Sequence, residues 1–343
     1  MFLLIEFEEI VKQILKANKF NIEKPEVKSV DFYAKLDDTF AYVDVKLYSN
    51  KLAQLDLLRR ACYRLLSKKK NDDAKLLLIV SSFVTPSLKE EIFKELGIII
   101  WDIRTLFALA FDHAEIYYKL EGILVQTLKT QVSEYAIIDK GFKESIITKL
   151  ISSETETKKI SVTSKGADLC KELLAIKAGS EESSLYEKKC IEILKYLFDN
   201  KTALDLWAVQ NSSDDGLNRF DLLCRIISYR DNFWEELSKD FHTRYIVFEF
   251  KNYSEKIKQG QIFTTEKYLF LTALRSVSFI IAREGADNNA IKAAKGALKE
   301  SGKLIVVLDN NDICKMLNFK DNGDEPAIIL RQVIDDMLIK LNR

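Results

Sequence analysis

The stretch Val43–Gln54, VDVKLYSNKLAQ, recurs without a gap as Phe248–Gln259, FEFKNYSEKIKQ. Each copy ends an apolar, strand-like run with an acid, one further residue and a lysine. The two triplets are Asp44-Val45-Lys46 and Glu249-Phe250-Lys251. Residues i and i+2 of a strand lie on the same face, so we expect each acid beside its lysine. On a buried strand such charges are costly unless they pair with each other or bind a metal ion.

A second register supports an internal duplication. FEEIVKQILK, from Phe7, lies over YEKKCIEILK, from Tyr186. Gly97 and Gly302, each next to the last apolar run of its copy, have the same offset as Lys46 and Lys251. We therefore predict two copies of one domain, the second with an insertion at Thr202–Thr243.

Apolar periodicity predicts the same order of elements in both copies. In the first copy we expect helix Phe7–Phe20, strands Val27–Leu36 and Phe40–Leu47, helix Leu52–Leu66, strand Lys75–Ser81, helix Ser87–Leu96 and strand Ile98–Trp101. In the second we expect helix Leu185–Phe198, strands Arg219–Ser228 and Arg244–Phe250, helix Lys256–Leu274, strand Val277–Ala282, helix Asn289–Glu300 and strand Lys303–Leu308. This pattern predicts an α/β protein with two domains, each a mixed central sheet flanked by helices.

The predicted domain limits are 1–114 and 181–343, joined by a helical connector at 115–180. The connector is rich in Lys, Ser, Thr and Glu, and Lys159–Thr163 is its best strand-like run. Gly179–Ser184 has the composition of a linker or a helix N-cap.

Composition excludes several classes of protein. With 47% hydrophobic and 30% charged residues the chain is typical of a soluble globular protein, and no apolar run approaches the ~20 residues of a membrane helix. Five scattered cysteines and two histidines argue against a zinc site and predict reduced thiols and a cytoplasmic location. The net charge of zero gives no indication of nucleic-acid binding, so the prediction of a nucleic-acid substrate depends on the residues of the site.

Each copy offers further carboxylates in matching places. Asp31 and Asp221 lie on the strand before the triplet, and Glu8 and Glu187 follow an aromatic residue on the first helix. Adjacent strands can bring two carboxylates to one divalent cation. Glu9 competes with Glu8, and we assign Asp37 and Asp38 to a turn.

The order helix Glu, strand Asp, strand Asp/Glu-x-Lys, helix Gln resembles the PD-(D/E)XK nuclease superfamily, whose fold is restriction-endonuclease-like. The resemblance covers about residues 1–110 and 185–320, in two tandem copies. It departs from the family where Val30 and Phe220 stand in place of a proline before the first Asp. It implies metal and catalytic roles for six acids: Glu8, Asp31, Asp44, Glu187, Asp221 and Glu249. It implies further catalytic roles for Lys46 and Lys251, and nucleic-acid contacts for Tyr48, Gln54, Tyr253 and Gln259.

The function implied is a Mg²⁺-dependent endodeoxyribonuclease, with Mn²⁺ as a substitute, that cuts duplex DNA in restriction or defence against foreign DNA. A homodimer and a partner subunit of a defence system stay open, and no membrane is expected. The alternatives are a catalytically silent module that binds DNA or protein, and a nuclease for RNA.

Purely structural explanations of the same residues remain open. Each acid–lysine pair is also explained by an ion pair on an edge strand, and Gln261 rivals Gln259. The tryptophans Trp101, Trp207 and Trp234 suit core packing as well as base stacking. His113, His242 and the lysine run Lys68–Lys70 have structural or solvated explanations.

Overall fold

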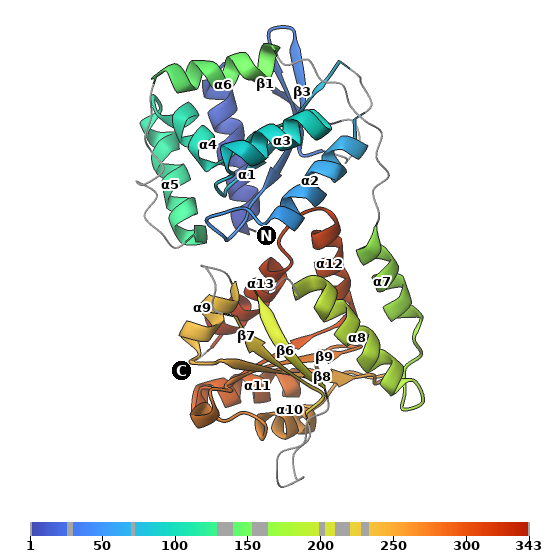
Figure 1. Ribbon diagram of the computed structural model, residues 1–343. Helices are drawn as coiled ribbons and strands as arrows, with labels where there is room; N and C mark the ends of the chain where they lie inside the picture. The colour runs from blue at the N-terminus through green and yellow to red at the C-terminus, as the bar shows by residue number, and fades with distance from the viewer. Residues whose placement is uncertain are drawn as a thin grey trace. The chain divides into compact units, whose positions relative to one another are not determined.

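The computed structural model describes residues 2–25, 30–69, 73–128, 140–152, 164–198, 203–209, 220–227 and 233–341. The chain forms two compact units (Figure 1). The first comprises Met1–Thr163 together with the distant segment Lys320–Glu325, and the second comprises Ser164–Phe319 and Pro326–Arg343. The predicted connector, 115–180, is shared between them, because its first two helices belong to the first unit and its third to the second.

The first unit is built on a mixed five-stranded sheet of order β1-β2-β3-β4-β5. β1, β2 and β3 pair antiparallel, whereas β3, β4 and β5 pair parallel. Its elements are α1 (Phe2–Ala17), β1 (Asn21–Glu23), β2 (Phe32–Leu36), β3 (Thr39–Lys46), α2 (Leu55–Ser67), β4 (Lys75–Val80), α3 (Pro86–Leu96), β5 (Ile98–Trp101), α4 (Ile103–Ala110), α5 (Ala114–Leu128) and α6 (Lys140–Ser152).

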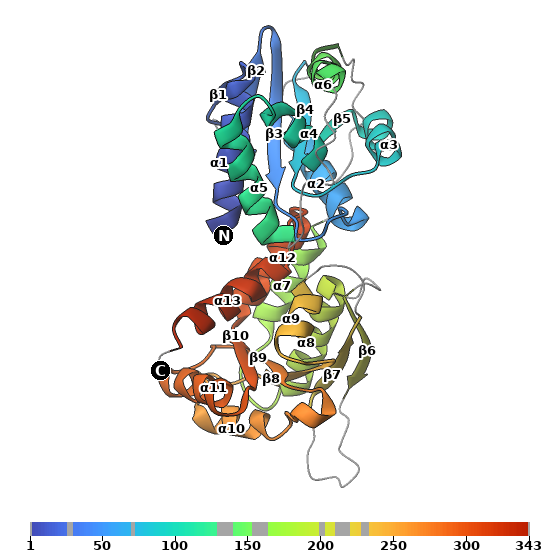
Figure 2. The ribbon, with the colours of Figure 1, turned by 90° about the vertical axis from the view of Figure 1, so that its left-hand side faces the viewer.

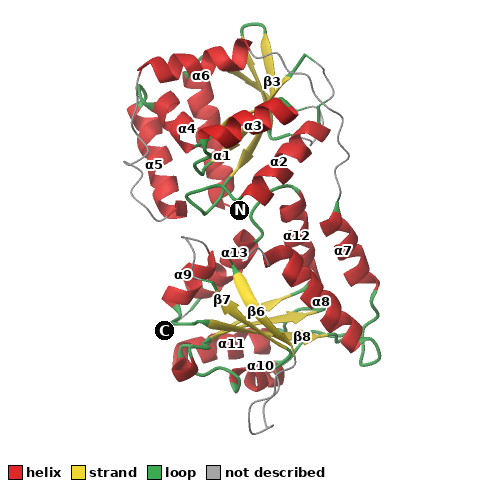
Figure 3. Cartoon of the chain, viewed as in Figure 1, coloured by secondary structure: helices red, strands yellow, loops and turns green. Residues whose placement is uncertain are grey.

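The second unit repeats this topology in a sheet of order β10-β9-β8-β7-β6. β6, β7 and β8 pair antiparallel, and β8, β9 and β10 pair parallel. Its elements are α7 (Lys165–Ala175), α8 (Ser183–Phe198), β6 (Leu204–Val209), β7 (Leu222–Ile226), α9 (Phe233–Asp240), β8 (Tyr245–Lys251), α10 (Gln259–Glu266), η2 (Leu271–Ala273), β9 (Val277–Ala282), α11 (Asn288–Ser301), β10 (Leu304–Leu308), α12 (Asn310–Asp321) and α13 (Ala327–Ile339). The predicted architecture of two mixed sheets flanked by helices is confirmed (Figure 3).

Helices cover both faces of each sheet, which explains why the central strands are largely apolar outside the acid–x–lysine triplets. In the first unit, Val43 and Val45 of β3 pack with α1 on one face, while α2 and α3 pack on the other (Figure 2). In the second unit, Phe248 and Phe250 of β8 share a core with α8, and Val247 shares the opposite core with α10 and α11.

Matching caps fix α3 and α11, the helices that precede the last strand of each sheet. The side chains of Thr85 and Asp287 accept backbone N–H groups at the starts of α3 and α11. Gly97 and Gly302 end these helices in the left-handed conformation, with φ of 66° and 64°. Glycine adopts this conformation without strain, which explains the matched glycines that the sequence shows.

Two of the predicted segments differ in the structure. The predicted helix Lys256–Leu274 is only α10 and the short turn η2, because the chain reverses in the antiparallel bridge Phe270–Arg275. The predicted insertion contains β6, a strand of the sheet itself. The predicted strand Lys159–Thr163 lies outside the described residues.

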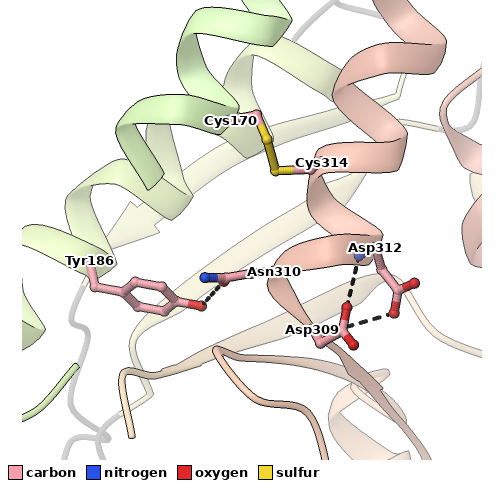
Figure 4. Close-up of a disulfide and its surroundings, with 6 residues drawn as sticks. All are labelled: Cys170, Tyr186, Asp309, Asn310, Asp312 and Cys314. Carbon is pink, nitrogen blue, oxygen red and sulfur yellow. Dashed lines mark hydrogen bonds between the residues drawn. A yellow bond between two sulfur atoms is a disulfide. The ribbon is translucent and has the colours of Figure 1, made fainter. Parts of the chain in front are cut away.

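A disulfide joins Cys170 of α7 to Cys314 of α12 within the second unit (Figure 4). The expectation of reduced thiols is therefore wrong for these two cysteines, which are 144 residues apart in the sequence and carried by neighbouring helices. Sequence spacing could not reveal this pairing. The other three cysteines, Cys62, Cys190 and Cys224, are buried thiols.

Among the helices that the structure describes, none is long and apolar enough to span a membrane.

Candidate active sites

In the first unit, Asp31 and Asp44 meet where β2 begins and β3 ends. The N–H of Asp31 donates to the carbonyl of Val43 over 3.1 Å. The N–H of Val45, between the acid and the lysine, donates to Asp31 Oδ2 over 2.6 Å. This antiparallel pairing brings together two carboxylates that are separated by a hairpin in the sequence.

In the second unit, Asp221 and Glu249 meet in the same way. The N–H of Phe250 donates to Asp221 Oδ2 over 2.8 Å, which is the counterpart of the bond from Val45 to Asp31. The N–H of Asp221 also donates to Glu249 Oε1 over 3.3 Å. The two copies thus build one constellation from strands in the same topological positions.

The lysine of each triplet lies beside its acid, as the strand periodicity predicts. Lys251 Nζ is 2.8 Å from Glu249 Oε2 and 3.6 Å from Asp221 Oδ2, so it bridges both carboxylates. Lys46 Nζ is 3.4 Å from Asp44 Oδ2 and 3.1 Å from Asp324 Oδ1. Lys46 therefore also pairs with Asp324, a carboxylate that lies outside the triplet.

Burial and crowding shape the electrostatics of the first site. Burial, and then the negative charge of Asp44, raise the pKa of Asp31 to about 7. Burial lowers the pKa of Lys46, but its ion pairs with Asp44 and Asp324 outweigh burial and raise that pKa. Asp44 is 1% exposed, and its Oδ2 accepts no hydrogen bond. A buried carboxylate oxygen without a hydrogen bond is costly unless a cation is close.

The second site has the same character with more solvent access. Burial raises the pKa of Glu249. Burial lowers the pKa of Lys251, but the charges of Glu249 and Asp221 outweigh it and raise that pKa. The side chains of Lys251 and Glu249 are 19% and 4% exposed, compared with 7% and 1% for their counterparts Lys46 and Asp44. The second constellation is accordingly the more accessible of the two.

The helix glutamates Glu8 and Glu187 lie on α1 and α8. Glu8 pairs with Lys12 at 2.7 Å on α1. α1 and α8 pack on the faces of Val43 and Phe248, whereas strand alternation puts the triplet acids on the opposite faces. In the part of the chain that the structure describes, no group of three or more His, Cys, Asp or Glu is placed to hold a metal ion.

Each site therefore offers two carboxylates and a lysine. The fit to Mg²⁺ rests on the paired hard oxygen ligands of each site, Asp31 with Asp44 and Asp221 with Glu249. Mg²⁺ commonly retains several waters and takes one or two carboxylates from the protein, so two suffice for one ion.

The predicted nucleic-acid contacts differ between the copies. Tyr253 is 45% exposed, whereas Tyr48 is 2% exposed and its hydroxyl donates to the carbonyl of Gly323 over 2.9 Å. Gln54 and Gln259 lie at the starts of α2 and α10. The side chain of Gln261, the rival of Gln259, accepts the N–H of Lys258 and so has a capping role.

For two tryptophans and one lysine, the structure decides between the structural and the functional explanation. Trp101 and Trp234 are 2% and 3% exposed and pack edge-on against Phe20 and Phe198, so they belong to the cores. Lys68 Nζ lies 3.6 Å from Asp44 Oδ1, so one lysine of the predicted solvated run belongs to the first site.

Sequence reasoning missed Asp324 and Glu325 at the first site and Tyr268 beside the second. Tyr268 packs edge-on against Phe220, and burial, then the charge of Glu249, raise its pKa. The local sequence DNGDEP around Asp324 indicates only a turn, and nothing in it points to Lys46.

No protein-family model and no curated protein matches the sequence. Among solved structures, the chain is similar to the restriction endonuclease FokI, bound to DNA (9% identity, TM-score 0.34) and in a second structure (12% identity, TM-score 0.35). The matches cover 75% and 78% of this chain and 44% and 51% of those chains, so this chain spans about half their length. At TM-scores this low the likeness carries no argument, and the two sites stand on their own geometry.

Proposed function

We propose that the chain is a metal-dependent endonuclease that hydrolyses phosphodiester bonds in DNA, and that the second unit carries the reaction. The observation that carries the proposal is the constellation of Asp221, Glu249 and Lys251, partly open to solvent. Two carboxylates that can bind a hard metal ion lie beside a lysine ammonium. The three residues follow one another along the chain in the same order as in the nuclease superfamily that the sequence resembles.

In this proposal Asp221 and Glu249 hold Mg²⁺, which Mn²⁺ can replace. When bound, the ion would neutralise charge on the scissile phosphate and lower the pKa of a water molecule. The backbone N–H of Phe250 donates to the Asp221 carboxylate and so orients it, while the backbone N–H of Asp221 donates to the Glu249 carboxylate. This preorganisation suits a ligand that must hold its place while the phosphate changes charge.

Lys251 acts as a hydrogen-bond donor in the proposed reaction. Its pKa is raised by Glu249 and Asp221, so the ammonium stays protonated at neutral pH and cannot take a proton from water. Its Nζ can instead orient the attacking water or stabilise the negative charge that develops on the phosphate.

The finer parts of the proposal come from the resemblance. They are duplex DNA as substrate, a role in restriction or defence, a cytoplasmic location, and a homodimer or partner subunit. Glu8 and Glu187 remain proposed site residues, as do Gln259 and Tyr253 as contacts to nucleic acid.

The test is cleavage of supercoiled plasmid, linear duplex DNA and RNA of matched length, each with Mg²⁺, Mn²⁺ or EDTA. The proposal expects nicked or linear DNA with either ion and none with EDTA. Cleavage of RNA alone would show that the substrate is RNA and not DNA. Cleavage in EDTA would show that the reaction does not need a metal ion.

A second candidate applies to the first unit, which we propose as a binding module. The observation that favours it is the ion pair of Lys46 with Asp324, because a lysine held by a third carboxylate is withdrawn from a substrate phosphate.

A further inference from the structure

Three residues of one short stretch contact a segment that is far away in the sequence. Ser49 donates from its N–H to Glu325 Oε2 over 2.9 Å and from its hydroxyl to Glu325 Oε1 over 2.6 Å. The Tyr48 hydroxyl donates to Gly323, and Lys46 pairs with Asp324. All these groups belong to the first unit.

Both oxygens of Glu325 are thus satisfied by one residue, and the side chain is 5% exposed. Hydrogen bonds from N–H and O–H groups to an ionised carboxylate are about twice as strong as neutral ones. Glu325 is therefore a buried carboxylate whose two oxygens both accept hydrogen bonds from one serine. We take such an arrangement as a preformed binding site for a carboxylate.

The backbone of the segment is shaped to reach this place. Gly323 has a φ of 76°, and a Cβ there would lie 2.4 Å from the backbone N of Ala61 on α2. The segment is also held at its start, since Lys320 Nζ lies 3.5 Å from Asp56 Oδ2.

The second copy has the same motif without this cover. Ser254, the counterpart of Ser49, is exposed, and so is Tyr253. In the described residues, Lys251 has ion pairs with its own triplet acid and with Asp221. The difference between the copies therefore lies in a single added segment.

We propose that the first acid–x–lysine motif is a binding site for carboxylates, filled by the chain's own Asp324 and Glu325. Lys46 and Ser49 are its donors to the two carboxylates, and Tyr48 donates to the Gly323 carbonyl of the same segment. The groups that would meet a substrate phosphate are occupied by an acidic peptide instead. This inference deepens the proposed binding role of the first unit, and it does not require that the second unit cleaves anything.

The experiment is amide hydrogen exchange, resolved by residue, on the full wild-type chain. The proposal expects slow exchange at the Ser49 N–H and fast exchange at the Ser254 N–H, because only Ser49 has the carboxylate partner. Equal and fast exchange at both serines would overturn the proposal without any variant.

The matched variants are Asp324→Ala/Glu325→Ala and, as control, Glu300→Ala/Asp336→Ala, which removes the same charge from exposed positions. The first should speed exchange at Ser49 about tenfold or more and leave β9 and β10 unchanged. The control should match the wild type. Unchanged exchange at Ser49 in the first variant would refute the carboxylate site.

If the double variant loses protection throughout the first unit, Ser49→Ala decides, since it removes one hydroxyl donor and keeps the backbone. It should speed exchange at the Gly323 N–H, and an unchanged rate there would contradict the proposal. Because the readout is exchange, a failure of DNA cleavage would leave this result standing.

Discussion

At the scale of single residues, each site rests on a carboxylate that accepts a backbone N–H from the neighbouring strand. Asp31 accepts from Val45, and Asp221 accepts from Phe250. Such a bond fixes the position of the carboxylate, and a lysine two residues along the strand from the triplet acid balances the charge. The chemistry of each site follows from three residues and one strand pairing.

Lys251→Met should reduce cleavage about 10²-fold or more, because it removes the donor that meets the developing charge and keeps the side chain's length. It also leaves Glu249 buried without its cation, which costs roughly 3–5 kcal/mol where the charge cannot be neutralised. Rates of plasmid nicking should be compared with those of Lys256→Met, a change at an exposed lysine. Equal rates for the two variants would remove Lys251 from the mechanism.

The stability of the first unit should depend on pH through the ionisation of Asp31. Its pKa is raised from 3.8 unfolded to about 7 folded, so its contribution is fully present below about pH 4 and is lost as pH rises to about 7. The limiting slope is about 1.4 kcal/mol per pH unit. Urea unfolding between pH 5 and 7.5 should show the wild type losing stability relative to Asp31→Asn. A constant difference between the two proteins would contradict the raised pKa.

At the scale of elements, the strands β2 to β5 and β7 to β10 and the helices α1, α2, α3, α8 and α11 could be predicted from apolar periodicity. β4 and β5 are buried along their whole lengths, and their runs of Leu and Ile have no other stable place. The two copies of the ungapped motif also share a parallel bridge that was not predicted from the sequence. Leu52 bridges to Phe83, and its counterpart Ile257 bridges to Ala286.

Other elements could not be predicted, for physical reasons. β1 has only three residues and an exposed pattern, so no periodicity marks it. The covering segment and the disulfide depend on contacts between residues that are far apart in the sequence. The helix glutamates illustrate the same limit, because which face of the sheet a helix covers is decided by packing.

Two glycines test whether the covering segment is held by shape. Both Gly323 and Gly302 have positive φ, but a Cβ at Gly302 would meet nothing within 4 Å. Gly302→Ala should cost about 1 kcal/mol from backbone strain alone. Gly323→Ala should cost more, since its Cβ must displace the backbone of α2. Urea unfolding of the two variants gives the comparison, and a smaller loss for Gly323→Ala would contradict the close approach.

At the scale of the whole molecule, one duplicated fold has two differently equipped sites. The topology and the acid–x–lysine geometry are the same in both units. The first site is covered by Lys320–Glu325, whereas the second keeps its lysine and Asp221 partly exposed. Under the proposed function, the first unit binds and the second carries the reaction.

The disulfide makes a separate prediction at this scale. A crosslink between Cys170 and Cys314 closes a loop of 144 residues, and its loss should destabilise the second unit by about 2–5 kcal/mol. Urea unfolding with and without reductant should show this shift for the wild type and none for Cys170→Ser/Cys314→Ser. An equal effect of reductant on both proteins would place the sensitivity elsewhere.

The most direct test of the central claim is cleavage of a labelled DNA duplex in Mg²⁺ by the wild type, Glu249→Gln and the matched control Glu255→Gln. Glu255 is exposed in the same motif, so its replacement changes the charge and leaves the site intact. We expect cleavage by the wild type and the control, and none above background by Glu249→Gln. Cleavage by Glu249→Gln at the wild-type rate would contradict the assignment of the reaction to the second unit.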